Sequence, residues 1–155
     1  MTRTDDFLMG HTRHASRVID VPVHRVLDTL LDPLALPAWN PAIRRVRGPS
    51  AARPGATYTI TLRGLPGHLT YDETGPRRVA MRWRMPGFAE DGTWQLQPGR
   101  QGVVVSHDFT HRGPLASLLE PAYREVAELR LERLARRVSG AGTDSTRRAT
   151  AWPEG

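Results

Sequence analysis

Apolar and polar residues alternate through much of the middle of the chain, which predicts β-strands. In residues 57–63, for example, Tyr58, Ile60 and Leu62 lie on one face, and the threonines between them lie on the other. The remaining strand-like segments are His14–Asp20, Ile43–Arg47, 69–73, 79–85, 94–96 and 103–109. The pattern therefore predicts about six or seven strands.

Glycine and proline residues separate these strands at intervals of about 8 to 12 residues. The predicted turns are Pro54–Gly55, Gly64–Gly67, Gly75–Pro76 and Pro98–Gly99, and a loop is predicted between Pro86–Gly87 and Asp91–Gly92. Strands joined in this way form an antiparallel meander. Because each strand has one apolar and one polar face, only one side of the sheet is expected to be covered.

Two short helices are predicted after the first strand. Pro22 suits the first turn of a helix, and apolar residues follow it at helical spacing, namely Val23, Val26, Leu27, Leu30 and Leu31. Asp32 followed by Pro33 is a second helix-start signal, because aspartate caps free backbone N–H groups. This second helix is expected to run to Trp39 and to end at Pro41.

A long C-terminal helix, from Pro121 to Ser139 and about 28 Å in length, is the expected cover of the sheet. Its apolar stripe contains Tyr123, Ala127, Leu131, Leu134 and Val138. Arg130 lies at the edge of this stripe, where an arginine either extends to water or contacts a ligand. Three leucines are out of phase with the stripe and predict a separate turn before Pro121, namely Leu115, Leu118 and Leu119.

Composition narrows the classes of partner. All 22 basic residues are arginines, and the formal net charge of +6 permits acidic partners. The arginines are scattered, whereas a nucleic-acid footprint clusters on one face, so no nucleic-acid partner is expected. The absence of cysteine excludes disulfides and thiolate metal sites. No apolar run is long enough for a signal peptide or a membrane span, so a cytoplasmic location is expected.

A chain of 155 residues is expected to form one domain. The segment 140–155 is rich in glycine, threonine and arginine and has no periodicity, which predicts a disordered tail. The expected organisation is therefore a flexible N-terminus at 1–12, a folded domain at 13–139, and the tail.

Two residue patterns in the last strand suggest catalysis or metal binding but fail on geometry. His107 and His111 share a strand face but lie about 13 Å apart, too far to bind one metal ion. Ser106, His107 and Asp108 are the residue types of a hydrolase triad, but neighbours on a strand point to opposite faces. The chain has neither a G-x-S-x-G motif nor a phosphate-binding glycine loop. No metal and no cofactor are expected.

The order of one strand, two short helices, about six strands and a long helix resembles the helix-grip fold of the START/pollen-allergen-like superfamily (SRPBCC). Within it, the chain looks most like the polyketide cyclase/dehydrase-like branch. The resemblance covers residues 13–139 and rests on VIDVPVHRVLDTLLDPLALPAWNPAI (18–43), PGATYTI (54–60), GPRRVAMRW (75–83), GTWQLQP (92–98), GVVVSHDF (102–109) and YREVAELRLERLARRV (123–138).

The resemblance implies an α+β fold in which a curved antiparallel sheet of about six or seven strands wraps around a long C-terminal helix. It also implies a deep cavity between the two. Members of the superfamily bind hydrophobic molecules such as lipids, polyketides and steroids. Some of them cyclise or dehydrate polyketide chains.

Large side chains on the apolar strand faces are the expected ligand-binding residues, although the same residues could simply fill a core. They are Trp39, Tyr58, Tyr71, Met81, Trp83, Met85, Trp94, Phe109 and Tyr123. Trp39 lies in a proline-rich bend, and two interpretations of it stay open. It either closes one end of the core or lines the mouth of the pocket.

His107 and Arg130 are the catalytic candidates. A neutral imidazole facing the pocket could act as a general acid or base in an enolisation or dehydration. His107 could equally be a hydrogen-bonded core residue. Arg130 could stabilise an enolate or bind the carboxylate end of a ligand.

Two functional hypotheses follow. In the first, the protein binds a hydrophobic small molecule (a polyketide, a lipid or similar), with polyketide cyclase/aromatase or dehydratase activity as the enzymatic form. In the second, it is a non-catalytic lipid or hydrophobic-ligand carrier, or an interaction module. A homodimer is compatible with both hypotheses.

Overall fold

The computed structural model describes residues 10–148, with side chains up to residue 140. Seven strands form one antiparallel sheet in the order β1-β7-β6-β5-β4-β3-β2. The strands are β1 (His11–Ile19), β2 (Arg45–Arg47), β3 (Thr57–Leu62), β4 (Leu65–Thr74), β5 (Arg78–Met85), β6 (Phe88–Gly99) and β7 (Gly102–Arg112). Strands β2 to β7 pair in chain order, which confirms the predicted meander.

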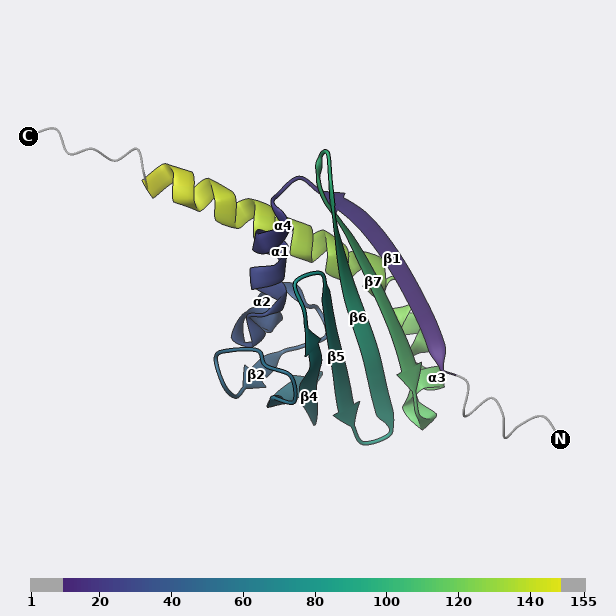
Figure 1. Cartoon of the computed structure of the whole chain (residues 1–155). Helices are drawn as coiled ribbons and strands as arrows, with labels where there is room; N and C mark the ends of the chain where they lie inside the picture. The colour runs from purple at the N-terminus through teal and green to yellow at the C-terminus, as the bar shows by residue number, and fades with distance from the viewer. Residues whose placement is uncertain (1–9, 149–155) are drawn as a thin grey trace, which may run out of the picture.

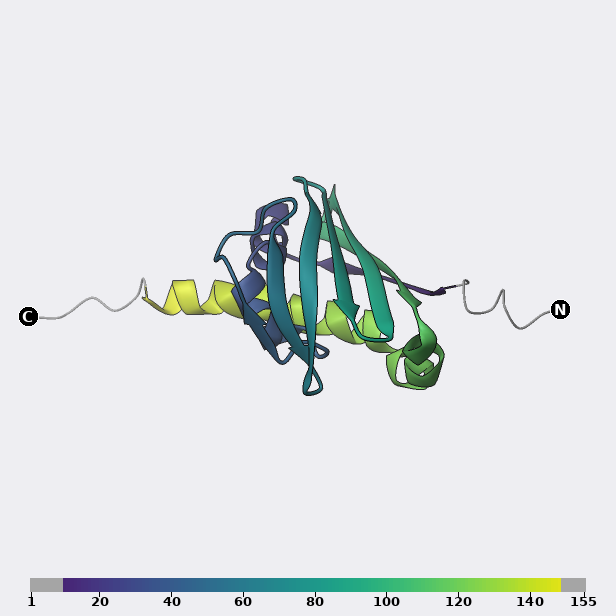
Figure 2. The same cartoon turned by 90° about the horizontal axis from the view of Figure 1, so that it is seen from below.

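The helices lie on the concave side of the curved sheet (Figures 1 and 2). They are α1 (Val23–Leu30), the 3-10 helix η1 (Pro33–Ala35), α2 (Leu36–Trp39), α3 (Pro114–Tyr123) and α4 (Val126–Arg148). Helix α4 crosses the sheet, with α1 and α2 packed beside it. This arrangement confirms the predicted helix-grip architecture, including the two short helices after the first strand. None of the helices between residues 10 and 148 is long and apolar enough to cross a membrane.

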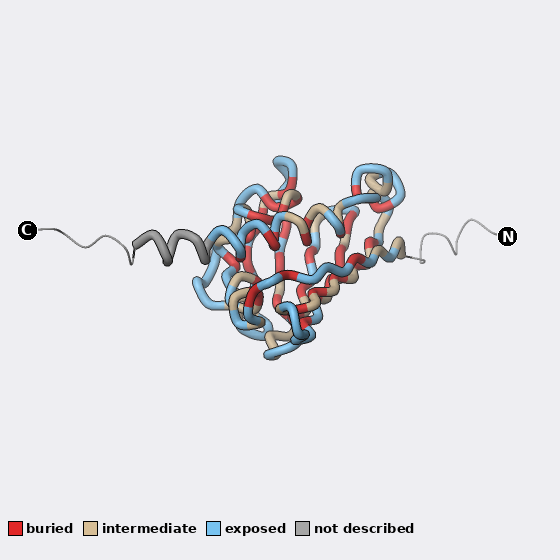
Figure 3. The backbone as a smooth tube through the Cα atoms, turned by 90° about the horizontal axis from the view of Figure 1, so that it is seen from above, coloured by how far each residue is buried: buried red, intermediate tan, exposed pale blue. Residues whose placement is uncertain are grey.

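The alternation of apolar and polar residues along the strands corresponds to an alternation of buried and exposed residues (Figure 3). In β3, Tyr58, Ile60 and Leu62 are buried, whereas the threonines between them are exposed or half-buried. Strands β5 and β7 repeat the pattern. The buried strand faces meet the apolar stripe of α4, in which Leu131 and Leu134 are buried. The core therefore lies between the concave face of the sheet and α4, as the sequence predicts.

The loop predicted between Pro86–Gly87 and Asp91–Gly92 is wrong. Met85 pairs directly with Phe88, so Pro86 and Gly87 alone form the turn, with Gly87 at a positive φ of 77°. Strand β6 begins at Phe88 and carries Asp91 and Gly92 in its interior. The Asp-Gly pair is a common turn signal, but here the register set by the preceding turn overrides it.

The predicted turn at Gly64–Gly67 is also too long. Leu62 pairs with Leu65, so Arg63 and Gly64 form a two-residue turn and β4 already contains Gly67. Both turn residues have positive φ, 49° for Arg63 and 82° for Gly64, as a tight hairpin turn of this type requires.

The predicted start of the C-terminal helix at Pro121 is wrong. Pro121 lies inside α3, which begins at Pro114 and also contains the leucines predicted to form a separate turn. The N–H of Leu115 donates to the carbonyl oxygen of Gly87, which fixes the start of α3 at the β5–β6 turn. A proline at the first helical position was the missed signal. Helix α4 begins only at Val126.

The predicted domain boundaries, 13 and 139, stay predictions. Strand β1 begins at His11, and α4 continues past Ser139 to Arg148. The rest of the predicted flexible N-terminus and disordered tail, residues 1–9 and 149–155, lies outside the described residues.

Candidate functional site

A buried ion pair joins Arg130 of α4 to Glu90 of β6 on the concave side of the sheet. Arg130 donates from Nη2 to Oε1 of Glu90 at 2.9 Å and from Nη1 to Oε2 at 3.2 Å. Both side chains are almost completely buried, with 1% and 3% of their area exposed. Such a two-pronged pair joins α4 to the sheet with defined geometry.

His107 of β7 is the next member of the cluster. Its Nε2 lies 3.2 Å from Nη1 of Arg130, and its Nδ1 lies 3.1 Å from the carbonyl oxygen of Thr93. A guanidinium can only donate and a carbonyl can only accept. Nε2 is therefore the acceptor, the proton is on Nδ1, and both ring nitrogens are engaged.

His111, which follows His107 and Phe109 on the same face of β7, completes the cluster. Its Nε2 donates to Oε1 of Glu90 at 2.6 Å, and its ring lies between those of Phe109 and Tyr123. Glu90 thus accepts hydrogen bonds from two cationic or polar partners. The carboxylate is satisfied without water.

Aromatic rings surround the charged groups. The guanidinium carbon of Arg130 lies 4.8 Å from the ring centroid of Trp83 and 4.7 Å from that of Phe109, both cation–π distances. The His107 ring stacks on Trp94 at 3.7 Å, and Trp94 meets the edge of Trp39 at 5.5 Å. A continuous row of contacts therefore runs from α4 across the concave face of the sheet to α2.

Burial and charge shift the pKa values of two members of the cluster. Burial alone would raise the pKa of Glu90, but Arg130 and His111 outweigh it and lower the value from 4.5 to about 2. Burial, reinforced by the Arg130 charge, lowers the pKa of His107 from 6.5 to about 3. At neutral pH the site therefore contains a carboxylate, a guanidinium and a neutral imidazole.

Two buried hydrogen-bond donors have no acceptor among the described residues, the indole Nε1 of Trp39 and the Nε of Arg130. The exposed fraction of Trp39 is 1% and that of Arg130 is 0%. Buried donors without partners are rare and costly in folded proteins. Both belong to the row of contacts just described, so the interior offers unpaired N–H groups from two helices, α2 and α4.

The structure brings together most of the residues predicted to bind a ligand. Trp39, Trp83, Trp94 and Phe109 belong to the cluster around the catalytic candidates His107 and Arg130, and Tyr123 contacts its His111 end. The position of Trp39 favours core closure over the pocket mouth, since its ring is buried against Trp94.

Tyr58 and Tyr71 belong to a separate aromatic pair, with ring centroids 5.8 Å apart. Their hydroxyl groups donate to the carbonyl oxygens of Ala51 at 2.7 Å and Leu30 at 2.8 Å. The two hydroxyls therefore tie the sheet to the segment before β3 and to α1. Of the two methionines predicted to bind a ligand, Met81 is buried, and Met85 is half-buried at the end of β5.

Sequence reasoning missed Glu90 and the role of His111. The predicted loop between Pro86–Gly87 and Asp91–Gly92 contains Glu90, and the sequence pattern suggests His111 only as a metal ligand, which the strand spacing excludes. The available signal was the period of two in Phe88, Glu90, Gly92 and Trp94, which continues the alternation of β6 through the Asp-Gly pair. A lone carboxylate on an apolar face would then have required a buried cation.

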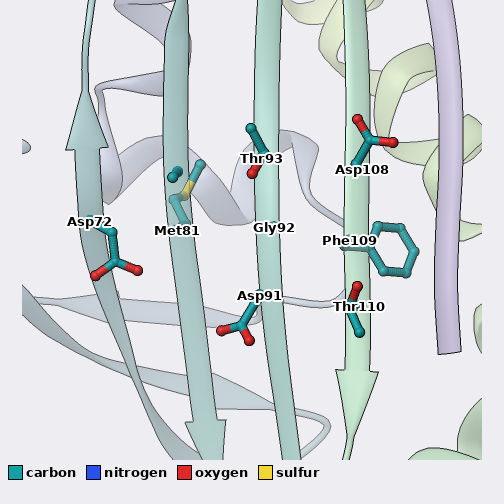
Figure 4. Close-up of a pocket in the computed structure, with 9 residues that line it drawn as sticks. Asp72, Met81, Asp91, Gly92, Thr93, Asp108, Phe109 and Thr110 are labelled. Atoms are coloured by element: carbon teal, nitrogen blue, oxygen red, sulfur yellow. The ribbon is translucent and has the colours of Figure 1, made fainter. Parts of the chain in front are cut away.

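A hollow on the outer face of the sheet offers a second constellation (Figure 4). Asp72, Asp91 and Asp108 surround it, on strands β4, β6 and β7. Each carboxylate already has a cationic or histidine partner: Asp72 pairs with Arg82, Asp91 with Arg84 and Arg112, and Asp108 with His14. The described residues contain no group of three or more side chains able to hold a metal ion. The buried cluster is therefore the better candidate.

Replacing Arg130 with methionine should destabilise the protein strongly, because it leaves the Glu90 carboxylate buried without its cation. The expected loss is about 3–5 kcal/mol in the free energy of unfolding, measured by urea denaturation. Arg136→Met is the matched control, since Arg136 pairs with Glu132 of the same helix at the surface and its loss should have little effect. Equal losses in the two variants would contradict a central role for the buried pair.

Acid should destabilise the protein partly through His107. Its folded pKa of about 3 lies below the ordinary 6.5, so between these values the unfolded chain binds a proton that the folded chain does not. Stability is therefore lost as the pH falls through this window. The Glu90 contribution, present above about pH 4.5, is lost in turn as the pH falls towards 2.

The test is the stability difference between wild type and His107→Gln from pH 7 to pH 4. The advantage of the wild type should shrink as the pH falls, because glutamine does not titrate. His24→Gln removes an exposed histidine and serves as the control. A difference for His107→Gln that does not change with pH would contradict the proposed neutral, buried imidazole.

Comparison with solved structures shows the same fold in several bacterial proteins. A protein from Chromobacterium violaceum is 23% identical, with 82% of this chain and 96% of that chain covered at a TM-score of 0.65. A START superfamily protein from Mycobacterium smegmatis is 16% identical, with 85% and 99% covered at a TM-score of 0.67. DynU16, from the dynemicin biosynthetic locus, is 18% identical at a TM-score of 0.59, and the alignment covers 83% of this chain and 47% of that chain.

No curated protein matches the sequence. A family model does match, the one described as polyketide cyclase / dehydrase and lipid transport, and it spans residues 11–139. This range contains every strand of the sheet and the members of the buried cluster. The chain therefore belongs to the polyketide cyclase / dehydrase and lipid transport family, and it has the helix-grip fold that the START superfamily protein shares.

Proposed function

We propose that the protein binds a hydrophobic small molecule between the concave face of the sheet and α4, and that this molecule carries a hydrogen-bond acceptor such as a ketone oxygen. The observation that carries the proposal is the pair of buried, unpaired N–H donors on Trp39 and Arg130. Each donor costs stability while it has no acceptor. A ligand oxygen would remove that cost for the donor it reaches.

The surroundings of these donors suit an apolar molecule with one polar end. Trp83, Trp94 and Phe109 present aromatic surface, and the charged groups among them are already paired with one another. A ligand held there needs no counter-charge. Membership of a family that includes lipid transport and polyketide chemistry supports the same class of ligand.

Entry requires side chains to move. The rings of Trp39, Trp94 and His107 contact one another, so a ligand reaching this row displaces at least one ring. Trp39 is the natural candidate, because α2 is a single short turn next to irregular chain. The proposed binding mode is therefore an induced fit at the α2 end of the concave side.

Non-catalytic binding is the form that the geometry supports best. Both nitrogens of His107 are occupied, by Arg130 and by the Thr93 carbonyl, so neither is free to exchange a proton with a ligand. Glu90 is held by Arg130 and His111 in the same way. A carrier of hydrophobic molecules needs no free acid or base.

Polyketide cyclase or dehydratase activity is the second candidate, and the Nε of Arg130 is the observation that favours it. An unpaired cationic N–H in a water-poor site stabilises an enolate oxygen. His107 would then have to leave Arg130 to act as a base. A homodimer and a cytoplasmic location stay predictions.

Ligand binding can be tested with 9-fluorenone and fluorene, which have nearly the same shape but differ by one ketone oxygen. Wild-type protein should bind fluorenone about tenfold more tightly, because the oxygen satisfies a buried donor. Titration of the intrinsic tryptophan fluorescence gives both dissociation constants. In Trp39→Phe, which keeps an aromatic ring but removes the indole N–H, the preference should fall while fluorene binding persists.

Equal affinity of the wild type for the two compounds would overturn the role of the donors. Binding of neither compound, together with no hydrophobic molecule in native mass spectra of the protein as purified from its host, would overturn ligand binding itself. Circular dichroism of the variant serves to separate loss of preference from loss of fold.

The two functional candidates differ in what His107→Gln does to turnover. With a synthetic poly-β-ketone thioester as substrate, a cyclase should lose about 100-fold or more in rate when its acid/base group is removed. A carrier should give no wild-type turnover above the uncatalysed rate. Product formation followed by liquid chromatography decides between them, with His24→Gln as the control.

A further inference from the structure

One hollow on the surface is lined mainly by arginines. Its borders are Arg44 and Arg45 at the start of β2, Thr61 of β3, and Arg63 and Gly64 of the β3–β4 turn. No carboxylate lines it. All three arginines are exposed, and none forms an ion pair with another described residue.

This lack of counter-charge distinguishes the hollow from strand β5 on the outer sheet face. All three arginines of β5 pair with carboxylates, Arg78 with Glu73, Arg82 with Asp72 and Arg84 with Asp91. The arginines of the hollow instead concentrate unbalanced positive charge at one corner of the molecule. An anion is the missing partner that this corner would bind.

The backbone pairing of β2 and β3 fixes the positions of these arginines relative to one another. Arg45 pairs with Thr61 across the β2–β3 ladder, and the N–H of Arg44 donates to the carbonyl oxygen of Thr61 at 2.8 Å. Arg63 lies two residues after Thr61, in the β3–β4 turn. The three guanidinium groups therefore project from one hairpin end and the edge strand beside it.

Arg63 also occupies a position that its backbone does not favour. Its φ of 49° is in the left-handed region, where asparagine or glycine is the usual residue of such a turn. An arginine here costs conformational energy that asparagine would largely avoid. The turn itself therefore does not favour arginine at this position.

An exposed aliphatic side chain lies next to the charges. Leu65 directly follows the turn, and 50% of its area is exposed. Among the described residues, the large exposed hydrophobic side chains are aliphatic, namely Val18, Leu34, Leu65 and Leu118. Single-stranded nucleic acids are bound through aromatic side chains on which bases stack, whereas lipid surfaces take up aliphatic ones.

We propose that the corner formed by Arg44, Arg45, Arg63 and Leu65 docks the protein on anionic membrane surfaces, with the arginines on lipid phosphate groups and the leucine among the acyl chains. The proposal does not depend on ligand binding between the sheet and α4. Basic clusters beside an aliphatic anchor bind bilayers that carry anionic lipids and release them as salt rises.

The test is co-sedimentation of full-length protein with vesicles of phosphatidylcholine alone or with about 30% phosphatidylglycerol, the anionic lipid that the charge argument requires. Wild type should bind only the anionic vesicles, and less at high salt. Arg45→Gln combined with Arg63→Asn should lower the partition coefficient at least about tenfold, because two membrane-facing charges are lost. Asparagine at position 63 suits the turn, so the fold should be kept.

The matched control combines Arg77→Gln with Arg100→Gln. Both residues are exposed and lie in the β4–β5 and β6–β7 connections, at the other end of the sheet from the β3–β4 turn. This double variant removes the same net charge and should bind anionic vesicles like the wild type. Leu65→Ser should weaken binding severalfold while leaving its salt dependence unchanged.

Three results would overturn the proposal. The first is that the wild type does not bind anionic vesicles. This result would overturn membrane docking even if inorganic phosphate protected the protein against thermal unfolding. The second is an equal loss in both double variants, which would mean that net charge alone drives binding. The third is an Arg45/Arg63 effect seen with a single-stranded RNA oligonucleotide but not with vesicles. Fluorenone affinity, measured in parallel, reports separately on the interior site.

Discussion

The interior of this protein is arranged around one cation, Arg130, which α4 inserts into the concave face of the sheet. Glu90 neutralises it, His107 accepts one of its hydrogen bonds, and two aromatic rings cover its faces. Apolar residues of similar volume would stabilise a core at least as well as a buried ion pair. Stability alone therefore does not account for the cluster.

Much of the fold follows from local sequence patterns. The alternation of apolar and polar residues predicts the buried faces of β3, β5 and β7. The helical stripe that contains Leu131 and Leu134 predicts the face of α4 that covers them. The errors had two different causes. The start of α3 depends on the long-range hydrogen bond from Leu115 to Gly87, whereas the path of β6 is set by the tight turn that pairs Met85 with Phe88.

The candidate site was predictable only in part. The sequence places His107 on the inward face of its strand, but it places Arg130 only at the edge of the helical stripe, where extension to water stays an open alternative. Glu90 could not be identified with them, because the reason for burying a carboxylate is a cation forty residues away in the sequence. The unpaired donors of Trp39 and Arg130 could not be predicted from the sequence. Whether a buried N–H has an acceptor depends on the packing of the whole interior.

The position of β1 has a consequence for how the chain is made. Ser16 and Ser106 face each other across β1 and β7, although ninety residues separate them. On the ribosome, β1 emerges first and has no partner until β7 follows, while the strands between them can pair one after another. Helix α4 follows β7 in the chain. Until it is made, the aromatic face of the sheet is open to other chains, so the interval between the synthesis of β7 and that of α4 is when this protein most needs protection from aggregation.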